Sequence, residues 1–381
     1  MANAPWRDRP AWRIPSRGEP LGSGAITDRY PEPLAHETLL VRRGRRSGLF
    51  TMAAVHSTAR GPALGGCRMW TYEDARAAVR DVLRLSRAMT FKAAVAGLPL
   101  GGGKGVIMLR PEEGTLSPER REAVLLDFGD TVEALDGTYL TAEDVGTSEP
   151  DMETIARRTS HVTGLSSGSG DPSPWTALGC EAAIRVTAER AFGSDDLSGR
   201  SIAVVGAGHV GGPLAELLAN AGAELLIADI DPRKRELADR LGARWTDPVS
   251  ALTAEVDLVA PCALGGVLNH DTVPQLRCRA IAGAANNQLA DEELADALAE
   301  RGILWAPDFV CNAGGIINIG VELESEGYSA DRAEPAARAV GDTLRQIFDA
   351  ADSESVTPLK AALALGERRV AGEELASGAD A

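Results

Sequence analysis

The feature that most constrains the fold is a glycine turn between an apolar run and a helical pattern. Gly206, Gly208 and Gly211 form a GxGxxG pattern directly after the β-like run 202–205. In dinucleotide-binding proteins the first glycine permits a tight turn, the second lets the backbone approach a pyrophosphate, and the third lets helix and strand pack closely. The helix N-terminus presents free N–H groups to the phosphates. The pattern predicts a Rossmann-type cofactor loop that also contains His209 and Val210.

Asp229 supports this prediction because it directly follows the next apolar run, 225–228, at the expected distance from the glycines. A carboxylate there accepts hydrogen bonds from the ribose hydroxyls and disfavours a 2′-phosphate, so NAD is favoured over NADP. Asp231 is a second candidate for this role, and the basic residues 233–235 leave NADP open. A glycine turn that binds no cofactor is the less favoured alternative.

From about residue 175 onward, short apolar runs alternate with helical patterns, and the runs in 256–261, 279–284 and 303–306 lead into polar or glycine loops. Alternation of this kind predicts a parallel, doubly wound sheet with ligands at the carboxyl ends of its strands. The stretch 331–371 is predicted to be helical apart from Pro335 and Pro358.

The preceding part of the chain has a different pattern. We predict a β-hairpin within 38–57, helices over 72–92 and 118–135, and a strand over 106–109 after the glycine-dense stretch 97–105. A further strand leads to Asp144. A chain of 381 residues is too long for one ordinary core, so two α/β domains are expected.

Composition excludes several classes of protein. The formal net charge of −16 disfavours a nucleic-acid partner, and no apolar run is long enough to span a membrane. The first thirty or so residues lack the apolar segment of a secretory signal and are expected to be a flexible extension. The cysteines are scattered, so neither a disulfide framework nor a metal site is predicted, and free thiols suit the reducing cytoplasm. They are Cys67, Cys180, Cys262, Cys278 and Cys311.

Lys92 and Lys104 are informative because each lies in an apolar or glycine-rich neighbourhood of a chain whose positive charge is mostly arginine. Loss of hydration lowers the pKa of a lysine toward the range that is useful for proton transfer. The glycines around Lys104 suggest close approach of the backbone to a ligand. The GGGK sequence lacks the spacing of a phosphate-binding P-loop. The commoner alternative is a pair of surface lysines, and for Asp144 the alternative is a solvated turn residue.

The motifs together resemble the Glu/Leu/Phe/Val amino-acid dehydrogenase superfamily, over roughly residues 36–365. Within it, the leucine, valine and phenylalanine dehydrogenases are most similar to this chain. The shared motifs, in chain order, are GPALGGCRMWTYEDA, RAMTFKAAVAGLPLGGGKGVI, YLTAEDVGT, SGDPSPWTALG, VVGAGHVG, APCALGG, GAANNQLAD and APDFVCNAGGIIN.

The resemblance implies an NAD-dependent enzyme that oxidatively deaminates an L-amino acid to its 2-oxo acid and ammonia, reversibly. It identifies Lys104 as the catalytic lysine, which acts as a neutral amine, and Asp144 as the catalytic aspartate. Lys92, assisted by the backbone of Gly65 and Gly66, would bind the substrate α-carboxylate. Two neighbouring lysines lower each other's pKa, so that one can be neutral while the other stays cationic.

Further positions are implied around the nicotinamide. Asn286, with Asn287 as a second candidate, is implied to hold the substrate or the nicotinamide ribose. The other implied cofactor positions are Thr176, Pro261, Cys262, Ala263 and Asn312.

The resemblance also implies an apolar substrate. Leu64 stands where the glutamate members carry a lysine that binds the side-chain carboxylate, and a leucine would leave that charge unpaired. The substrate pocket would be lined by Leu64, Ala142, Ile316 and Ile319, although aliphatic residues more often only fill a core. Leucine, valine and isoleucine are favoured, with phenylalanine or another aromatic amino acid as the alternative. A non-catalytic NAD-binding regulator is a less favoured alternative of another class.

The resemblance also implies a domain organisation. We expect an extension over 1–35, a catalytic, substrate-binding and oligomerisation domain over 36–164, and a Rossmann domain over 165–354. The C-terminal helices, about 355–381, would complete the catalytic domain, and a cleft would separate the two domains. A cytoplasmic homo-oligomer is expected.

Overall fold

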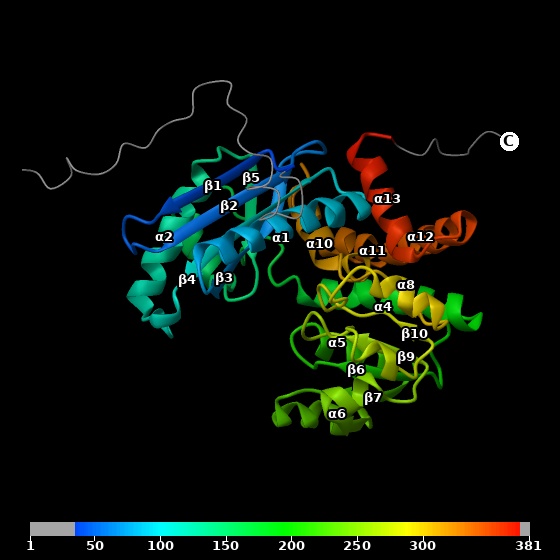
Figure 1. The fold of residues 1–381 in the computed structure, drawn as a ribbon. Helices are drawn as coiled ribbons and strands as arrows, with labels where there is room; N and C mark the ends of the chain where they lie inside the picture. Colours follow the sequence, from blue (N-terminus) through cyan, green and yellow to red (C-terminus); the bar gives the residue numbers. More distant parts are fainter. Residues whose placement is uncertain (1–34, 374–381) are drawn as a thin grey trace, which may run out of the picture. The chain divides into compact units, whose positions relative to one another are not determined.

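The computed structural model describes residues 35–373 (Figure 1). The predicted N-terminal extension therefore lies outside the described residues, apart from Ala35. Within 35–373 the chain forms two separate β-sheets with helices packed on them, so the expected two-domain α/β architecture is confirmed. In this part of the chain, no helix combines the length and the apolar character needed to cross a membrane.

The first sheet is mixed and has the strand order β1-β2-β4-β3-β5. Its strands are β1 (Thr38–Arg43), β2 (Phe50–Ser57), β3 (Ala63–Thr71), β4 (Gly101–Leu109) and β5 (Tyr139–Glu143). β1 and β2 pair antiparallel from Thr38–Val55 to Arg43–Phe50, which confirms the predicted hairpin. β2 and β4 are also antiparallel, whereas β3 runs parallel to both β4 and β5.

Helices cover both faces of this sheet, because the strands carry apolar side chains on each face. α1 (Ala75–Val95) packs on the face of Met52, Ala54 and Val106, whereas α2 (Pro118–Glu133) and α3 (Glu149–Ala156) pack on the opposite face. The short 3₁₀ turn η2 (Pro111–Glu113) precedes α2. α1 begins where the Asp74 side chain accepts a hydrogen bond from the N–H of Ala77.

The glycines around Lys104 suggested close approach of the backbone to a ligand, but the structure gives a different reason for them. They lie in β4, and the space beside them is filled by the protein itself. A Cβ added to Gly103 would lie 2.6 Å from the ring of Tyr139, and one added to Gly105 would collide with the ring of Phe128. The missing side chains therefore let aromatic rings pack directly on the strand.

The second sheet is entirely parallel, with the order β11-β10-β9-β6-β7-β8. Its strands are β6 (Ser201–Val205), β7 (Glu224–Ala228), β8 (Arg244–Thr246), β9 (Leu258–Pro261), β10 (Ala280–Ile281) and β11 (Leu304–Trp305). The chain proceeds outward from β6 to β8 and then returns to β9 on the other side of β6. This reversal is the topological switch point of a doubly wound fold, as predicted.

Five helices connect or flank these strands, with two 3₁₀ turns among them. They are α4 (Ser173–Phe192), α5 (Gly211–Asn220), η3 (Pro232–Lys234), α6 (Arg235–Leu241), α7 (Pro248–Leu252), η4 (Val273–Gln275) and α8 (Leu294–Glu300). α5 follows β6 directly after the glycine turn, so the predicted strand–turn–helix unit is confirmed.

The C-terminal region consists of α9 (Asp308–Cys311), α10 (Gly314–Glu322), α11 (Ala330–Arg338), α12 (Val340–Glu354) and α13 (Pro358–Val370). Pro335 lies inside α11 rather than interrupting it, whereas Pro358 is the first residue of α13. α13 returns to α1, where the Arg369 guanidinium donates to the carbonyl oxygens of Ala94 at 3.2 Å and Val95 at 2.6 Å.

The close packing of Tyr139 on β4 leads to a first prediction. Gly103→Ala should lower the free energy of unfolding by about 1–3 kcal/mol, because the added methyl group must displace a buried ring. The measurement is urea-induced unfolding followed by circular dichroism. Gly212→Ala is the control, since a Cβ there meets its nearest neighbours at an ordinary 3.7 Å. If both variants were as stable as the unaltered protein, the packing explanation would be wrong.

Candidate active site

The centre of the candidate site is an ion pair between Lys104 and Asp144. Lys104 is a buried residue of β4, and Asp144 is the first residue after β5, as predicted. The Nζ atom of Lys104 lies 3.0 Å from Oδ1 of Asp144. β3 runs between β4 and β5 and contributes Gly65 and Gly66 at this level. A Cβ on Gly66 would lie 2.7 Å from the Cβ of Asp144, so the glycine makes room for the carboxylate.

The second oxygen of Asp144 is held by Arg68, a residue that the sequence analysis did not identify. The Nε atom of Arg68 donates to Oδ2 of Asp144 at 3.0 Å. Burial by itself would raise the pKa of Asp144, but the positive charges of Lys104 and Arg68 outweigh burial and keep that pKa below its usual value. Asp144 is therefore an ionised carboxylate at neutral pH.

Lys92 lies in the last turn of α1, and its contacts differ from those of Lys104. Its Nζ atom donates to Oδ1 of the buried Asn312 at 2.6 Å. The amide nitrogen of Asn312 in turn donates to Oδ1 of Asn286 at 2.8 Å. Burial, reinforced by the charge of Lys104, lowers the pKa of Lys92 to about 8. The two lysines therefore differ in their partners: Lys92 contacts a neutral amide, whereas Lys104 forms an ion pair with a carboxylate.

The predicted apolar lining is buried in one continuous hydrophobic cluster. Leu64 of β3, Ala142 of β5, and Ile316 and Ile319 of α10 all belong to it. Leu64 is only 1% exposed, so a charged group could not be placed against it without losing its hydration. Because the cluster contains many other core residues, membership in it does not by itself define a substrate pocket.

Each glycine of the GxGxxG turn has a distinct environment. Gly206 has a φ of +107°, which a residue with a side chain rarely adopts. Gly208 is exposed, and a Cβ there would meet no atom of the described chain within 4 Å. Gly211 packs against the Gly206 carbonyl, with the Cβ of Cys262 3.0 Å from where its own would be. The geometry matches the predicted turn, open approach and close packing, and His209 and Val210 lead into α5.

Asp229 follows β7, beside the glycine turn. Its carboxylate accepts hydrogen bonds from the N–H of Ala207 at 2.7 Å and from the N–H of Asp231 at 2.9 Å. Asp231 is engaged with Arg233, whose side-chain nitrogens donate to both of its oxygens at 2.8–3.1 Å. A cavity of about 610 Å³ lies alongside, lined among others by Gly208, Asp231 and Arg233.

The loop after β9 lies against the same turn. Pro261 ends β9, the N–H of Cys262 donates to the carbonyl oxygen of Val205 at 2.8 Å, and Ala263 is in close contact with Gly206. Thr176 lies in α4, and its hydroxyl donates to the carbonyl oxygen of Pro172 at 3.0 Å. Asn287, next to Asn286, has a φ of +52°. All the sequence-predicted cofactor positions thus lie in the second sheet, its loops or the adjoining helices.

Comparison with known proteins identifies the family. A family model described as Glu/Leu/Phe/Val dehydrogenase, dimerisation domain, matches residues 38–161, and a second, described as Glutamate/Leucine/Phenylalanine/Valine dehydrogenase, matches residues 226–378. The chain therefore belongs to the Glu/Leu/Phe/Val dehydrogenase family, whose members are amino-acid dehydrogenases that use a nicotinamide cofactor.

Individual relatives cover nearly the whole chain. Leucine dehydrogenase from Bacillus subtilis is 42% identical over 90% of this chain and 93% of its own length. Valine dehydrogenase from Streptomyces virginiae is 41% identical over 88% of this chain and 94% of its own. The crystal structure of L-tryptophan dehydrogenase from Nostoc punctiforme superposes with a TM-score of 0.76 and 38% identity, and covers 89% of this chain and 97% of the other.

The environment of Lys92 leads to a second prediction. Lys92→Met should raise the free energy of unfolding at pH 7 by at most about 3 kcal/mol, because a buried ammonium with a lowered pKa destabilises the folded state. The folded protein releases this proton near pH 8, whereas the unfolded chain keeps it up to the ordinary lysine pKa of 10.5. The stabilisation should therefore be full below pH 8 and should disappear as the pH rises toward that value.

Thermal unfolding at pH 7 and pH 10 measures this difference. Lys360→Met is the control, because Lys360 is an exposed lysine paired with Asp296. A stabilisation by Lys92→Met that is equal at both pH values would contradict the burial of a charged amine.

Proposed function

We propose that the protein catalyses the reversible, NAD-dependent oxidative deamination of an apolar L-amino acid to its 2-oxo acid and ammonia, with leucine, valine and isoleucine preferred. The observation that carries this proposal is the buried Lys104–Asp144 pair with Lys92 nearby, in a chain that belongs to an amino-acid dehydrogenase family. A non-catalytic NAD-binding regulator would have no need of a buried pair of this kind.

We assign Lys92 to the substrate α-carboxylate. Its ammonium contacts the neutral amide of Asn312, so a carboxylate could add a full charge–charge interaction there. Gly65 and Gly66 would contribute backbone groups beside it. Asn286 and Asn312 form a hydrogen-bonded pair of amides that would hold the substrate or the nicotinamide ribose.

Lys104 and Asp144 would perform the proton transfers. A nicotinamide held by these residues would supply the acceptor for the hydride of the substrate α-carbon, and water would then attack the resulting iminium group. The ionised Asp144 would take a proton from the amino group or from the attacking water, and Lys104 would exchange protons with the oxygen that is added at the amino-bearing carbon. Proton transfer by positioned groups typically contributes about 10²–10⁴-fold to the rate.

The residues of the glycine turn fit a dinucleotide. The open space at Gly208 and the start of α5 suit a pyrophosphate, with Thr176, Pro261, Cys262 and Ala263 toward the nicotinamide. The oxygens of Asp229 keep lone pairs for ribose hydroxyls after accepting two backbone hydrogen bonds. Arg233 already pairs with Asp231, and this pairing neutralises a positive charge that would otherwise attract a 2′-phosphate.

The apolar preference rests on Leu64, with Ala142, Ile316 and Ile319 as the remaining lining. Aromatic substrates form the second candidate, favoured by the small side chain of Ala142 and by the likeness to an L-tryptophan dehydrogenase.

For the domains we propose boundaries at 36–164 and 165–354, with about 355–381 completing the first and the active site in a cleft between them. The matched dimerisation-domain model supports assembly as a homo-oligomer. The free cysteines suit a reducing cytoplasm.

An assay of NADH formation with single L-amino acids tests the proposed function. We expect kcat/KM to be highest for leucine, valine and isoleucine, with only modest differences among them, since one methylene is worth about 1–3 kcal/mol. Phenylalanine and tryptophan should be poorer substrates, and glutamate should be inactive. Lys104→Ala should abolish turnover while NAD binding is retained.

Two outcomes would overturn this assignment. Tight NAD binding without activity toward any amino acid would favour a regulator, and substantial turnover by Lys104→Ala would remove the lysine from the mechanism. A maximum for phenylalanine or tryptophan would instead select the second candidate.

Cofactor choice can be tested at Asp229. Asp229→Asn keeps an oxygen acceptor for the Ala207 N–H but removes the negative charge, so we expect the ratio of kcat/KM for NADP to that for NAD to rise about tenfold or more. Glu216→Gln is the control, because Glu216 lines the cavity next to the glycine turn, together with Gly208 and Asp231, but pairs with Arg240. An unchanged ratio in Asp229→Asn would show that the selectivity lies elsewhere.

A further inference from the structure

Arg68 connects the candidate active site to a second carboxylate outside it. Its Nε atom donates to Oδ2 of Asp144 at 3.0 Å, and its terminal nitrogen donates to Oδ2 of Asp81 at 3.1 Å. The side chains of Arg68, Asp81 and Asp144 are only 17–19% exposed. A single guanidinium therefore spans two largely buried carboxylates, one on α1 and one at the end of β5.

Asp81 is itself fixed from two further directions. The hydroxyl of Tyr72 donates to its Oδ2 at 2.7 Å, and Arg84 donates to its Oδ1 at 2.9 Å. The hydrogen bond from Tyr72 and the charges of both arginines outweigh burial and hold the pKa of Asp81 below its usual value. Burial raises the pKa of Tyr72, so its hydroxyl remains a donor. Asp81 is thus a carboxylate that is held in place and can fix the position of Arg68.

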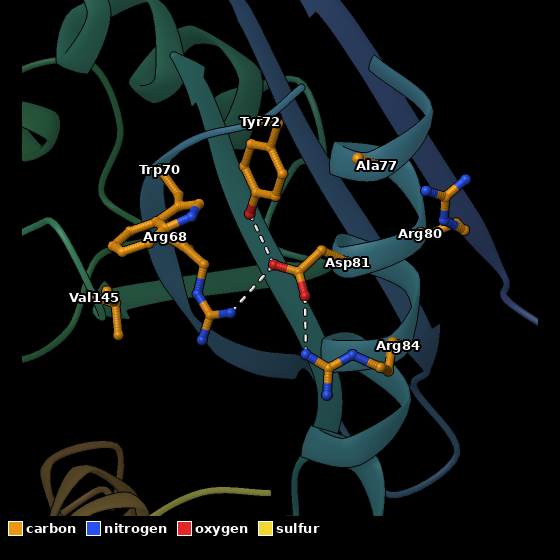
Figure 2. Close-up of a pocket in the computed structure, with 8 residues that line it drawn as sticks. All are labelled: Arg68, Trp70, Tyr72, Ala77, Arg80, Asp81, Arg84 and Val145. Carbon is orange, nitrogen blue, oxygen red and sulfur yellow. Dashed lines mark hydrogen bonds and ion pairs between the residues drawn. The ribbon is translucent and has the colours of Figure 1, made fainter. Parts of the chain in front are cut away.

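Figure 2 shows this arrangement within a cavity of about 640 Å³, where Tyr72, Arg68 and Arg84 all converge on Asp81. Arg80 lines the same cavity, but its side chain points away from this cluster (Figure 2). The predicted site residues Lys92 and Lys104 do not line the cavity. The cluster therefore reaches Asp144 through Arg68, at the carboxylate oxygen that does not contact Lys104.

We infer that Arg68, anchored by Asp81, is a positioning residue that fixes the orientation of the Asp144 carboxylate toward Lys104 and keeps it ionised. This inference rests on the function proposed above. Each oxygen of Asp144 has a separate cation, Lys104 on Oδ1 and Arg68 on Oδ2. Rotation of the carboxylate would break both contacts. A planar guanidinium can hold both carboxylates at once, whereas an ammonium is a single point charge.

Other titratable groups also face Asp144, but they cannot replace Arg68. The groups that interact with it are Lys104 of β4, Arg68 and Cys67 of β3, Lys92 of α1, Tyr139 of β5 and Tyr72. Among the described residues, only Lys104 and Arg68 form an ion pair with its carboxylate. Loss of Arg68 would leave one cation in contact, and the pKa of Asp144 would rise.

The decisive variant is Arg68→Gln. Because Asp144 must be ionised, activity is lost as the pH falls through its pKa, so the acid limb of the kcat/KM profile should move up by about one pH unit or more. At the optimal pH, kcat should fall about tenfold or more through misplacement of Asp144, while KM for leucine stays within about threefold.

Arg84→Gln is the matched control. It removes one positive charge from the same cavity and one hydrogen bond to Asp81, at the other carboxylate oxygen. Arg84 does not touch Asp144. We expect its pH profile to match that of the unaltered protein. Arg68→Lys should return the acid limb close to its original pH without restoring kcat, since the ammonium cannot span both carboxylates.

Asp81→Asn provides a second test, which also serves if Arg68→Gln does not fold. It keeps the charge of Arg68 but weakens its anchor, so kcat should fall with little movement of the acid limb. The inference is overturned if a folded Arg68→Gln variant keeps both its kcat and its acid limb, or if Asp81→Asn keeps its kcat. It is also overturned if the acid limb of Arg84→Gln moves as far as that of Arg68→Gln. Inactivity of the unaltered protein toward every amino acid would instead refute the proposed function.

Discussion

A charged lysine and a charged aspartate can be buried inside a protein at an acceptable cost only when each neutralises the charge of the other. Removal of water from either ion alone costs several kcal/mol, and a buried pair that loses one member is strongly destabilising. Lys104 and Asp144 meet this condition at 3.0 Å, with side chains 6% and 19% exposed. The arrangement of β3, β4 and β5 therefore has to place these two residues in contact.

The glycines of the central strands make that arrangement possible. Gly66 leaves room for the Cβ of Asp144, and Gly103 leaves room for the ring of Tyr139, whose hydroxyl donates to the carbonyl oxygen of Gly65 at 2.6 Å. Lys92 depends on a more distant contact. The C-terminal carbonyls of its helix accept hydrogen bonds from Arg369 of α13, so the last helix of the chain secures the end of α1. Residues far apart in the sequence thus determine where both lysines lie.

The sequence predictions succeeded where neighbouring residues determine the structure and failed where residues far along the chain determine it. The turn at Gly206–Gly211 and the strand before Asp144 follow from local backbone preferences, and both are confirmed. The glycines near Lys104 were misread because the atoms that occupy the space beside them, in Tyr139 and Phe128, come from other elements. Arg68 was missed because its carboxylate partners lie 13 and 76 residues away. An arginine within an apolar strand was the available signal.

The balance of charge in the site agrees with a substrate that carries a single carboxylate. Arg68 and Lys104 are matched by Asp81 and Asp144, and the more exposed Arg84 adds one further positive charge beside Asp81. Within residues 35–373, the side-chain hydrogen bond of Lys92 goes to a neutral amide, so one ammonium has no carboxylate in contact. An α-carboxylate would supply that charge. A second carboxylate on the substrate would instead meet Leu64 and its aliphatic neighbours, where burial without a partner is costly.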